Sequence, residues 1–177
     1  MAAARRVVLP RRFVLLSLVC LTASGSAGLI AEVVWSRVLA AMFGSALTGT
    51  GLLLAIFMAG LGVGAAIGGR VARRNVPPLA AFGVVEVCVG LLVFATPALF
   101  RLAAPRTILF ERHLSDAMAP LAPALASIVI LGPIVILMGM TFPLFLAGIR
   151  GEKESLGSDA GWVYGINTFG AVAGTLL

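Results

Sequence analysis

The sequence predicts an all-α, polytopic transmembrane bundle of about five spanning helices. The chain has 177 residues, of which 60% are hydrophobic and only 11% are charged, whereas soluble domains carry about 25% charged residues. A soluble core of this size cannot bury so much apolar surface, because small domains have a large surface for their volume. The apolar residues also fall into five long runs. We therefore expect the lipid bilayer to cover the apolar faces.

The chain opens with a basic head, residues 1–12, followed by a first helix predicted over 13–32. A cleaved secretory signal also begins this way, but its apolar core has only about 7 to 15 residues. This run is longer and more apolar runs follow it, so we expect a retained spanning helix. Glu32 and Arg37 are then expected at the outer headgroups, with Trp35 as an interfacial anchor. In the alternative, the helix continues and the two charges line an outward cavity.

The second and third helices are predicted over 47–69 and 79–100. Gly60, Gly64 and Gly68 recur every four residues and so share one helix face, where small residues let another helix approach closely in lipid. A dinucleotide-binding glycine loop has a similar spacing, but it requires a preceding strand and a βαβ unit. The uncharged run over 47–69 provides neither. The third helix carries a single charge, Glu86.

The fourth and fifth helices are predicted over 121–149 and 161–177. The fourth exceeds the roughly 20 residues needed to cross, and its three prolines predict a kinked, tilted helix: Pro123, Pro133 and Pro143. The fifth repeats the small-residue spacing at Gly170 and Gly174 and carries Asn167, which is typical of helix–helix contacts. It stops within an apolar run, so we expect a truncated last helix. Residues 13–177 form one bundle in this interpretation.

Glu86 is the foremost candidate functional residue, because an ionisable group inside a spanning helix is costly and usually faces the bundle interior. Two interpretations are open: a proton or cation site, or one half of a structural ion pair or hydrogen-bond network, for which Arg70 and Arg74 are the possible partners. Glu32, Arg37 and Asn167 are the further candidates for substrate, ion or pairing contacts. No catalytic, cofactor or metal-binding set is visible. Cys20 and Cys88 lie in apolar segments and predict no disulfide.

The distribution of Lys and Arg predicts an inner-membrane protein with a cytoplasmic N-terminus. In that orientation nine of the 13 basic residues lie on the cytoplasmic side and four lie outside, as the positive-inside rule requires. No basic run with interleaved aromatic residues occurs, so we expect no nucleic-acid partner.

Four segments in order resemble the membrane half of fused major-facilitator/spermidine-synthase-like proteins. They are SGSAGLIAEVVWSRVL, FMAGLGVGAAIGGRVARR, PIVILMGMTFPLF and GWVYGINTFGAVAGTLL, which begin at residues 24, 57, 133 and 161. The resemblance implies facilitator-like packing and a soluble domain similar to polyamine aminopropyltransferases, which this sequence lacks. The chain departs from the facilitator loop motif, because Gly69 and Ala72 stand where that motif has Asp and Gly.

The resemblance implies a membrane domain that anchors the enzyme or moves a polyamine-like cation, with no catalysis by this segment alone. Two alternatives are a non-enzymatic subunit or scaffold that packs against other membrane proteins, and part of a facilitator-type secondary transporter. The expected partners are lipid together with a soluble synthase-like domain, a second copy of the chain or another membrane protein. Five helices fall short of the two six-helix halves of a facilitator.

Overall fold

The computed structural model describes residues 11–74, 76–111, 113, 115, 118–149 and 156–175. Every regular element in these ranges is an α-helix: α1 (Arg11–Phe43), α2 (Ala46–Val71), α3 (Pro78–Glu111), α4 (Leu121–Ile149) and α5 (Leu156–Thr175). The predicted all-helical bundle is confirmed. The basic head over 1–10 lies outside the described residues.

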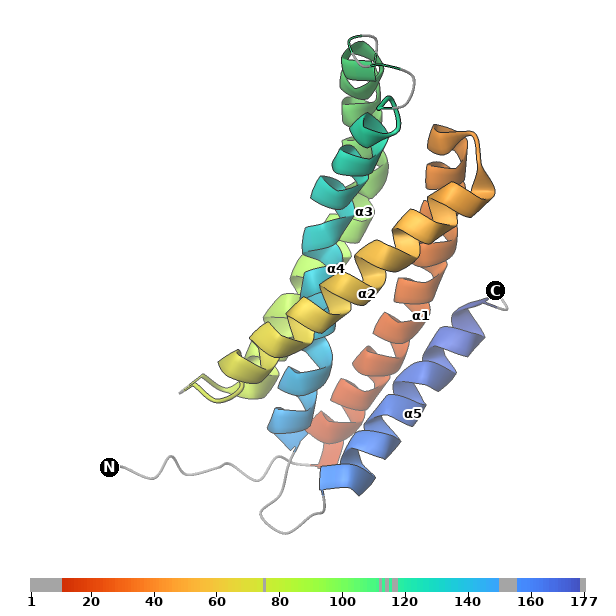
Figure 1. Ribbon diagram of the computed structural model, residues 1–177. Helices are drawn as coiled ribbons and strands as arrows, with labels where there is room; N and C mark the ends of the chain where they lie inside the picture. The colour runs from red at the N-terminus through yellow and green to blue at the C-terminus, as the bar shows by residue number, and fades with distance from the viewer. Residues whose placement is uncertain are drawn as a thin grey trace.

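Four of the described helices are long and apolar enough to cross a membrane: Leu18–Phe43, Ala46–Val71, Pro78–Glu111 and Leu121–Ile149. Successive helices run in opposite directions, so α1, α3 and α5 all begin at the end of the bundle where α2 and α4 finish (Figure 1). The chain therefore has the architecture of a multi-pass membrane protein.

The helices follow the neighbour order α3, α4, α2, α1, α5, because α4 packs on α2 and α3 while α1 packs on α2 and α5. Figure 1 shows α2 crossing obliquely and α5 lying beside α1. Buried side chains form two clusters along this row. One surrounds Trp35, Leu39 and Leu131, and the other surrounds Phe82, Leu144 and Phe145. Both clusters include α4, so this helix is the centre of the fold.

Helix α1 is longer than predicted, because it runs on to Phe43 instead of ending near residue 32. Nothing between Glu32 and Phe43 breaks a helix, since Glu, Arg, Leu and Ala are all compatible with helical backbone. Trp35 is only 3% exposed and packs against Phe57 of α2, with ring centroids 6.0 Å apart. The prediction that Trp35 is an interfacial anchor is therefore wrong. Trp35 is a core residue of the α1–α2 hairpin.

The α1–α2 turn depends on Gly44, which has a positive φ of 62°. The side chain of Ser45 then caps α2 by accepting a hydrogen bond from the Thr48 backbone N–H at 3.3 Å. A left-handed backbone conformation costs roughly 1–2 kcal/mol for residues with a Cβ, and Asn tolerates it better than most.

We expect Gly44→Ala to lower the free energy of unfolding by about 1 kcal/mol, because Ala pays the left-handed penalty that glycine avoids. No side-chain clash contributes, since an added Cβ would meet nothing within 4 Å. Unfolding in mixed micelles followed by circular dichroism measures this change. Gly44→Asn is the matched control and should lose less. Equal losses for the two variants would contradict the backbone explanation.

Helices α3 and α5 also differ from their predicted bounds, whereas α4 covers 121–149 as its apolar run does. Helix α3 continues past residue 100 to Glu111 and contains Pro97 and Pro105. Beside Pro97, which lacks an N–H, the hydroxyl of Thr96 donates to the Val93 carbonyl that would otherwise lose its partner. Helix α5 begins at Leu156, five residues before its apolar run.

Candidate intramembrane carboxylate site

Glu86 lies two turns into α3, among residues that hold α3 against α4. Phe82, Val85 and Val89 are buried in the second core cluster, and the ring of Phe82 meets that of Phe145 edge-on at 5.2 Å. Glu86 follows Val85 around the helix, and its carboxyl group faces the side chain of Ser24 on α1. Glu86 is therefore half-buried, with apolar side chains of α3 and α4 on one side and the hydroxyl group of Ser24 facing its carboxyl group.

One oxygen of Glu86, Oε1, is buried and has no hydrogen-bond partner. Buried polar atoms in proteins are nearly always bonded, and an unsatisfied one costs roughly 1–3 kcal/mol, more when it is charged. The described helices bring no Lys or Arg into an ion pair with it. The carboxylate is thus a strong hydrogen-bond acceptor in a largely apolar environment. Its Oε1 atom can still accept hydrogen bonds from a ligand.

Thr141 of α4 lies at the same height as Glu86. Helices α3 and α4 are antiparallel, with Gly148 packed on Leu79 and Phe145 on Phe82, and continuing that register brings Thr141 level with Glu86. Thr141 is 9% exposed, and its hydroxyl donates to the Met138 carbonyl at 2.7 Å. Glu86, Ser24 and Thr141 thus form a polar layer across α3, α1 and α4.

Arg70 does not pair with Glu86 in the described part of the bundle. Arg70 lies in the last turn of α2, where Gly64 and Gly68 form the buried face and Arg70 itself is exposed. Its position two residues after Gly68 turns it about 200° away from that face. The structure therefore has no contact that would support a structural pair of Glu86 with Arg70.

Asn167 is a packing residue of α5 rather than a neighbour of Glu86. A Cβ added at Gly25 would lie 2.8 Å from Asn167 Oδ1 and 2.6 Å from its backbone oxygen, so the two helices touch at this point. Gly25 and Ser24 point about 100° apart on α1. Asn167 and Glu86 consequently approach different faces of α1.

Glu32 and Arg37 both lie inside α1 and make no ion pair with each other within the described ranges. Glu32 is near the middle of the span Leu18–Phe43 and is half-buried, while Arg37 is exposed one and a half turns before the helix ends. Residues five apart on a helix do not face each other. Glu32 is therefore an acidic residue inside a continuous helix that is long enough to cross a membrane, and its expected position at the headgroups stays a prediction.

The predicted packing glycines lie where helices touch most closely. On α2, an added Cβ at Gly60 would lie 2.8 Å from the Val135 side chain, and one at Gly68 would lie 2.7 Å from Pro143, while Gly64 meets the Ile136 carbonyl and Gly139. On α5, Gly170 packs on the Thr22 carbonyl and Gly174 lies against Ser26. In each pair of helices the residue numbers of the contacting positions rise together, so α2 and α4 are parallel, and α1 and α5 are parallel.

Ser26 joins α1 to α5 by donating a hydrogen bond from its hydroxyl to the Gly170 carbonyl at 2.6 Å. This bond forms only because Gly170 has no side chain to separate the backbones. Interhelical hydrogen bonds in membranes average about 0.6 kcal/mol and reach about 1.7 kcal/mol.

We expect Ser26→Ala to lower the free energy of unfolding by about 1 kcal/mol through loss of this interhelical bond. Ser36→Ala is the matched control, because the Ser36 hydroxyl bonds only to Val33 of its own helix. Unfolding in mixed micelles measures both variants. A loss for Ser36→Ala as large as that for Ser26→Ala would contradict the interhelical assignment.

Sequence reasoning missed Ser24 and Thr141. Both are small hydroxyl residues inside apolar runs, and their relation to Glu86 depends on which helices become neighbours. Within the described ranges no three His, Cys, Asp or Glu residues gather as metal ligands, and Cys20 and Cys88 are free thiols. Comparison of the chain with protein-family models, curated proteins and solved structures gives no match.

Proposed function

We propose that this chain is the integral membrane domain of a spermidine-synthase-like protein and that Glu86 binds a polyamine-like cation on its way through the bundle. The supporting observation is the buried Oε1 of Glu86, which lacks a hydrogen-bond partner. An ammonium group carries three hydrogen-bond donors and a positive charge. It would therefore give this oxygen both the donor and the counter-charge that it lacks. The choice of a polyamine as the cation rests on the four sequence segments that resemble the family.

In this proposal the polar layer provides the remaining contacts for an ammonium group. Ser24 faces the carboxyl group, and the Thr141 hydroxyl oxygen lies at the same height. Hydroxyl oxygens accept hydrogen bonds from an ammonium while the carboxylate balances its charge. Any transfer of an aminopropyl group belongs to a separate soluble domain, and the chain resides in the inner membrane with its N-terminus in the cytoplasm.

The test is uptake of radiolabelled spermidine by proteoliposomes that contain the full chain. We expect the unaltered chain to take up label and Glu86→Gln to lose uptake, because the amide keeps the size of the side chain but removes its charge. Glu111→Gln, at the end of α3, is the control and should retain uptake. Uptake that survives Glu86→Gln would overturn the role of Glu86.

Packing against another membrane protein is the second candidate function, and the outward face of α5 favours it. Trp162 and Phe169 are each 73% exposed, and a Cβ at Gly161 or Gly165 would meet nothing within 4 Å. Aromatic residues beside small ones suit contact with a further membrane helix. An unaltered chain that takes up no spermidine, yet forms a complex with another membrane protein that Gly165→Leu disrupts, would favour this packing function over transport.

A further inference from the structure

Three exposed arginines gather where α2 ends. Arg70 lies in the last turn of the helix, and Arg73 and Arg74 follow shortly after it. The backbone keeps turning past the end of the helix, because Ala72 has a φ of −58°. The N–H of Arg73 then donates to the carbonyl of Arg70 at 3.3 Å, and that of Arg74 donates to the carbonyl of Val71 at 2.9 Å. Residues three and four apart in such a turn share one side, so the three arginines extend from the same side of the chain.

None of the three guanidinium groups has a hydrogen-bond or ion-pair partner among the residues that the structure describes. The sequence contains no acidic residue between Glu32 and Glu86, and Arg70 does not reach Glu86. A guanidinium group carries five N–H donors in a planar fork that matches the oxygens of a phosphate group. Three such groups without a counter-charge therefore form a surface whose complement is a phosphate anion.

The length of α2 places these arginines at the level of the lipid headgroups. The candidate span Ala46–Val71 has 26 residues, which extend about 39 Å at 1.5 Å per residue. This length exceeds the hydrocarbon core of roughly 30 Å, so both ends of the helix reach the headgroup layers. The phosphate groups nearest to the arginines are then those of the surrounding lipid. Basic clusters beside a spanning helix attract anionic lipids in particular.

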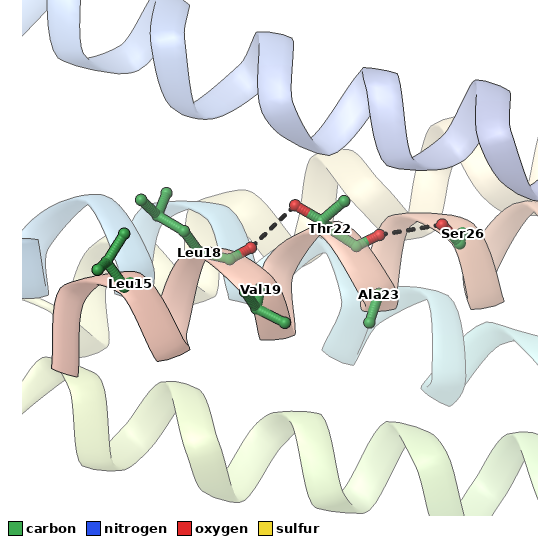
Figure 2. Close-up of a pocket in the computed structure, with 6 residues that line it drawn as sticks. All are labelled: Leu15, Leu18, Val19, Thr22, Ala23 and Ser26. Atoms are coloured by element: carbon green, nitrogen blue, oxygen red, sulfur yellow. Dashed lines mark hydrogen bonds between the residues drawn. The ribbon is translucent and has the colours of Figure 1, made fainter. Parts of the chain in front are cut away.

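The pocket along α1 is a separate surface and offers nothing to an anion. Its lining residues are all uncharged: Leu15, Leu18, Val19, Thr22, Ala23 and Ser26. Figure 2 shows that the Thr22 hydroxyl donates to the Leu18 carbonyl and that the Ser26 hydroxyl donates to the Thr22 carbonyl. Because both protons are already used, this pocket has no free donor for a phosphate oxygen. The arginines at the end of α2 are the better match.

We infer that Arg70, Arg73 and Arg74 bind the phosphate group of an anionic phospholipid at the end of α2. The bound headgroup supplies the negative charge that the described residues do not provide there. It would hold the turn between α2 and α3 at the membrane surface. This site is independent of the cation site proposed at Glu86, because it has the opposite charge and uses exposed side chains.

The test is native mass spectrometry of the full chain released from vesicles of equal phosphatidylglycerol and phosphatidylcholine. We expect the unaltered chain to retain phosphatidylglycerol in preference. Retention should fall about fivefold for each arginine removed, in Arg73→Gln and in Arg73→Gln combined with Arg74→Gln. Arg101→Gln is the matched control, because Arg101 is an exposed arginine of α3 with no other Lys or Arg within four residues. Its removal should leave retention unchanged.

Equal retention of the two lipids by the unaltered chain would overturn the proposal, as would an Arg101→Gln loss matching that of Arg73→Gln. Arg73→Lys combined with Arg74→Lys decides the result if the Gln variants insert poorly, because it keeps the charge but removes the planar fork. Retention should still fall in this variant. Unchanged retention would show attraction by charge alone and would exclude a guanidinium–phosphate site.

Inorganic phosphate distinguishes a lipid site from a site for a soluble phosphate compound. Added to the released chain, it should leave phosphatidylglycerol bound. Displacement of the lipid by inorganic phosphate would assign the three arginines to a soluble anion and overturn the lipid proposal. Because spermidine uptake by the unaltered chain is a separate measurement, failure of this proposal and failure of the Glu86 proposal are distinguishable.

Discussion

Gly64→Ala should unfold the bundle more readily than any other single methyl addition on α2. The added Cβ would meet the backbone carbonyl of Ile136 and lie 2.8 Å from the Cα of Gly139. Neither neighbour can rotate away, since both are backbone atoms of the central helix. Overpacking typically costs 1–3 kcal/mol, and we expect about 3 kcal/mol here because relief requires α2 and α4 to separate.

Gly62→Ala is the matched control for this expectation. Gly62 lies on the same helix two residues away, and a Cβ there meets nothing within 4 Å. In a helix Ala is more favourable than Gly by about 1 kcal/mol, so Gly62→Ala should be neutral or stabilising. Unfolding of both variants in mixed micelles gives the comparison. Similar losses at the two positions would show that helix propensity, not the α2–α4 contact, governs the result.

The sequence was informative about this interface because small residues at a spacing of four can be read without knowing their partner. Gly60, Gly64 and Gly68 identify a contact face in lipid by themselves. Their partner on α4 was not predictable in the same way. Gly139 is a single small residue among branched and proline positions, and its role follows only from the parallel register of α2 and α4.

Helix ends were harder to predict than helix faces. A membrane helix does not stop where it leaves the hydrocarbon, and α1 and α3 both continue past their apolar runs, to Phe43 and Glu111. Gly44 ends α1 through its positive φ. For this reason Glu32 and Trp35 lie inside a continuous helix, and Trp35 is buried in the core instead of acting as an anchor at an interface.

The candidate site was likewise predictable only in part from the sequence. Glu86 stands out in the sequence, because a lone carboxylate in an apolar run is conspicuous, but its surroundings depend on tertiary contacts. Ser24 is more than 60 residues away along the chain and Thr141 is on a third helix. Arg70 was expected nearby from its end of the membrane, yet its angle around α2 directs it elsewhere.

Glu86→Leu should stabilise the bundle while abolishing spermidine uptake. A carboxylate in a spanning helix costs roughly 2.5–3.5 kcal/mol on insertion scales, and Oε1 recovers none of this through a hydrogen bond. Leu is close in size and fits the surrounding Phe82, Val85 and Val89. We therefore expect the free energy of unfolding to rise by about 2 kcal/mol, because Leu carries no such insertion cost.

The sign of this change separates the two interpretations of Glu86. If the carboxylate were half of a structural pair, its removal would leave the partner unsatisfied and lower stability by several kcal/mol. If it binds a cation, removal relieves a cost that the empty site carries, so stability and uptake change in opposite directions. Unfolding in mixed micelles and uptake by proteoliposomes, measured on one preparation, report both quantities. Glu111→Leu at the end of α3 should alter neither, and a loss of stability in Glu86→Leu alone would assign Glu86 to the structure of the bundle.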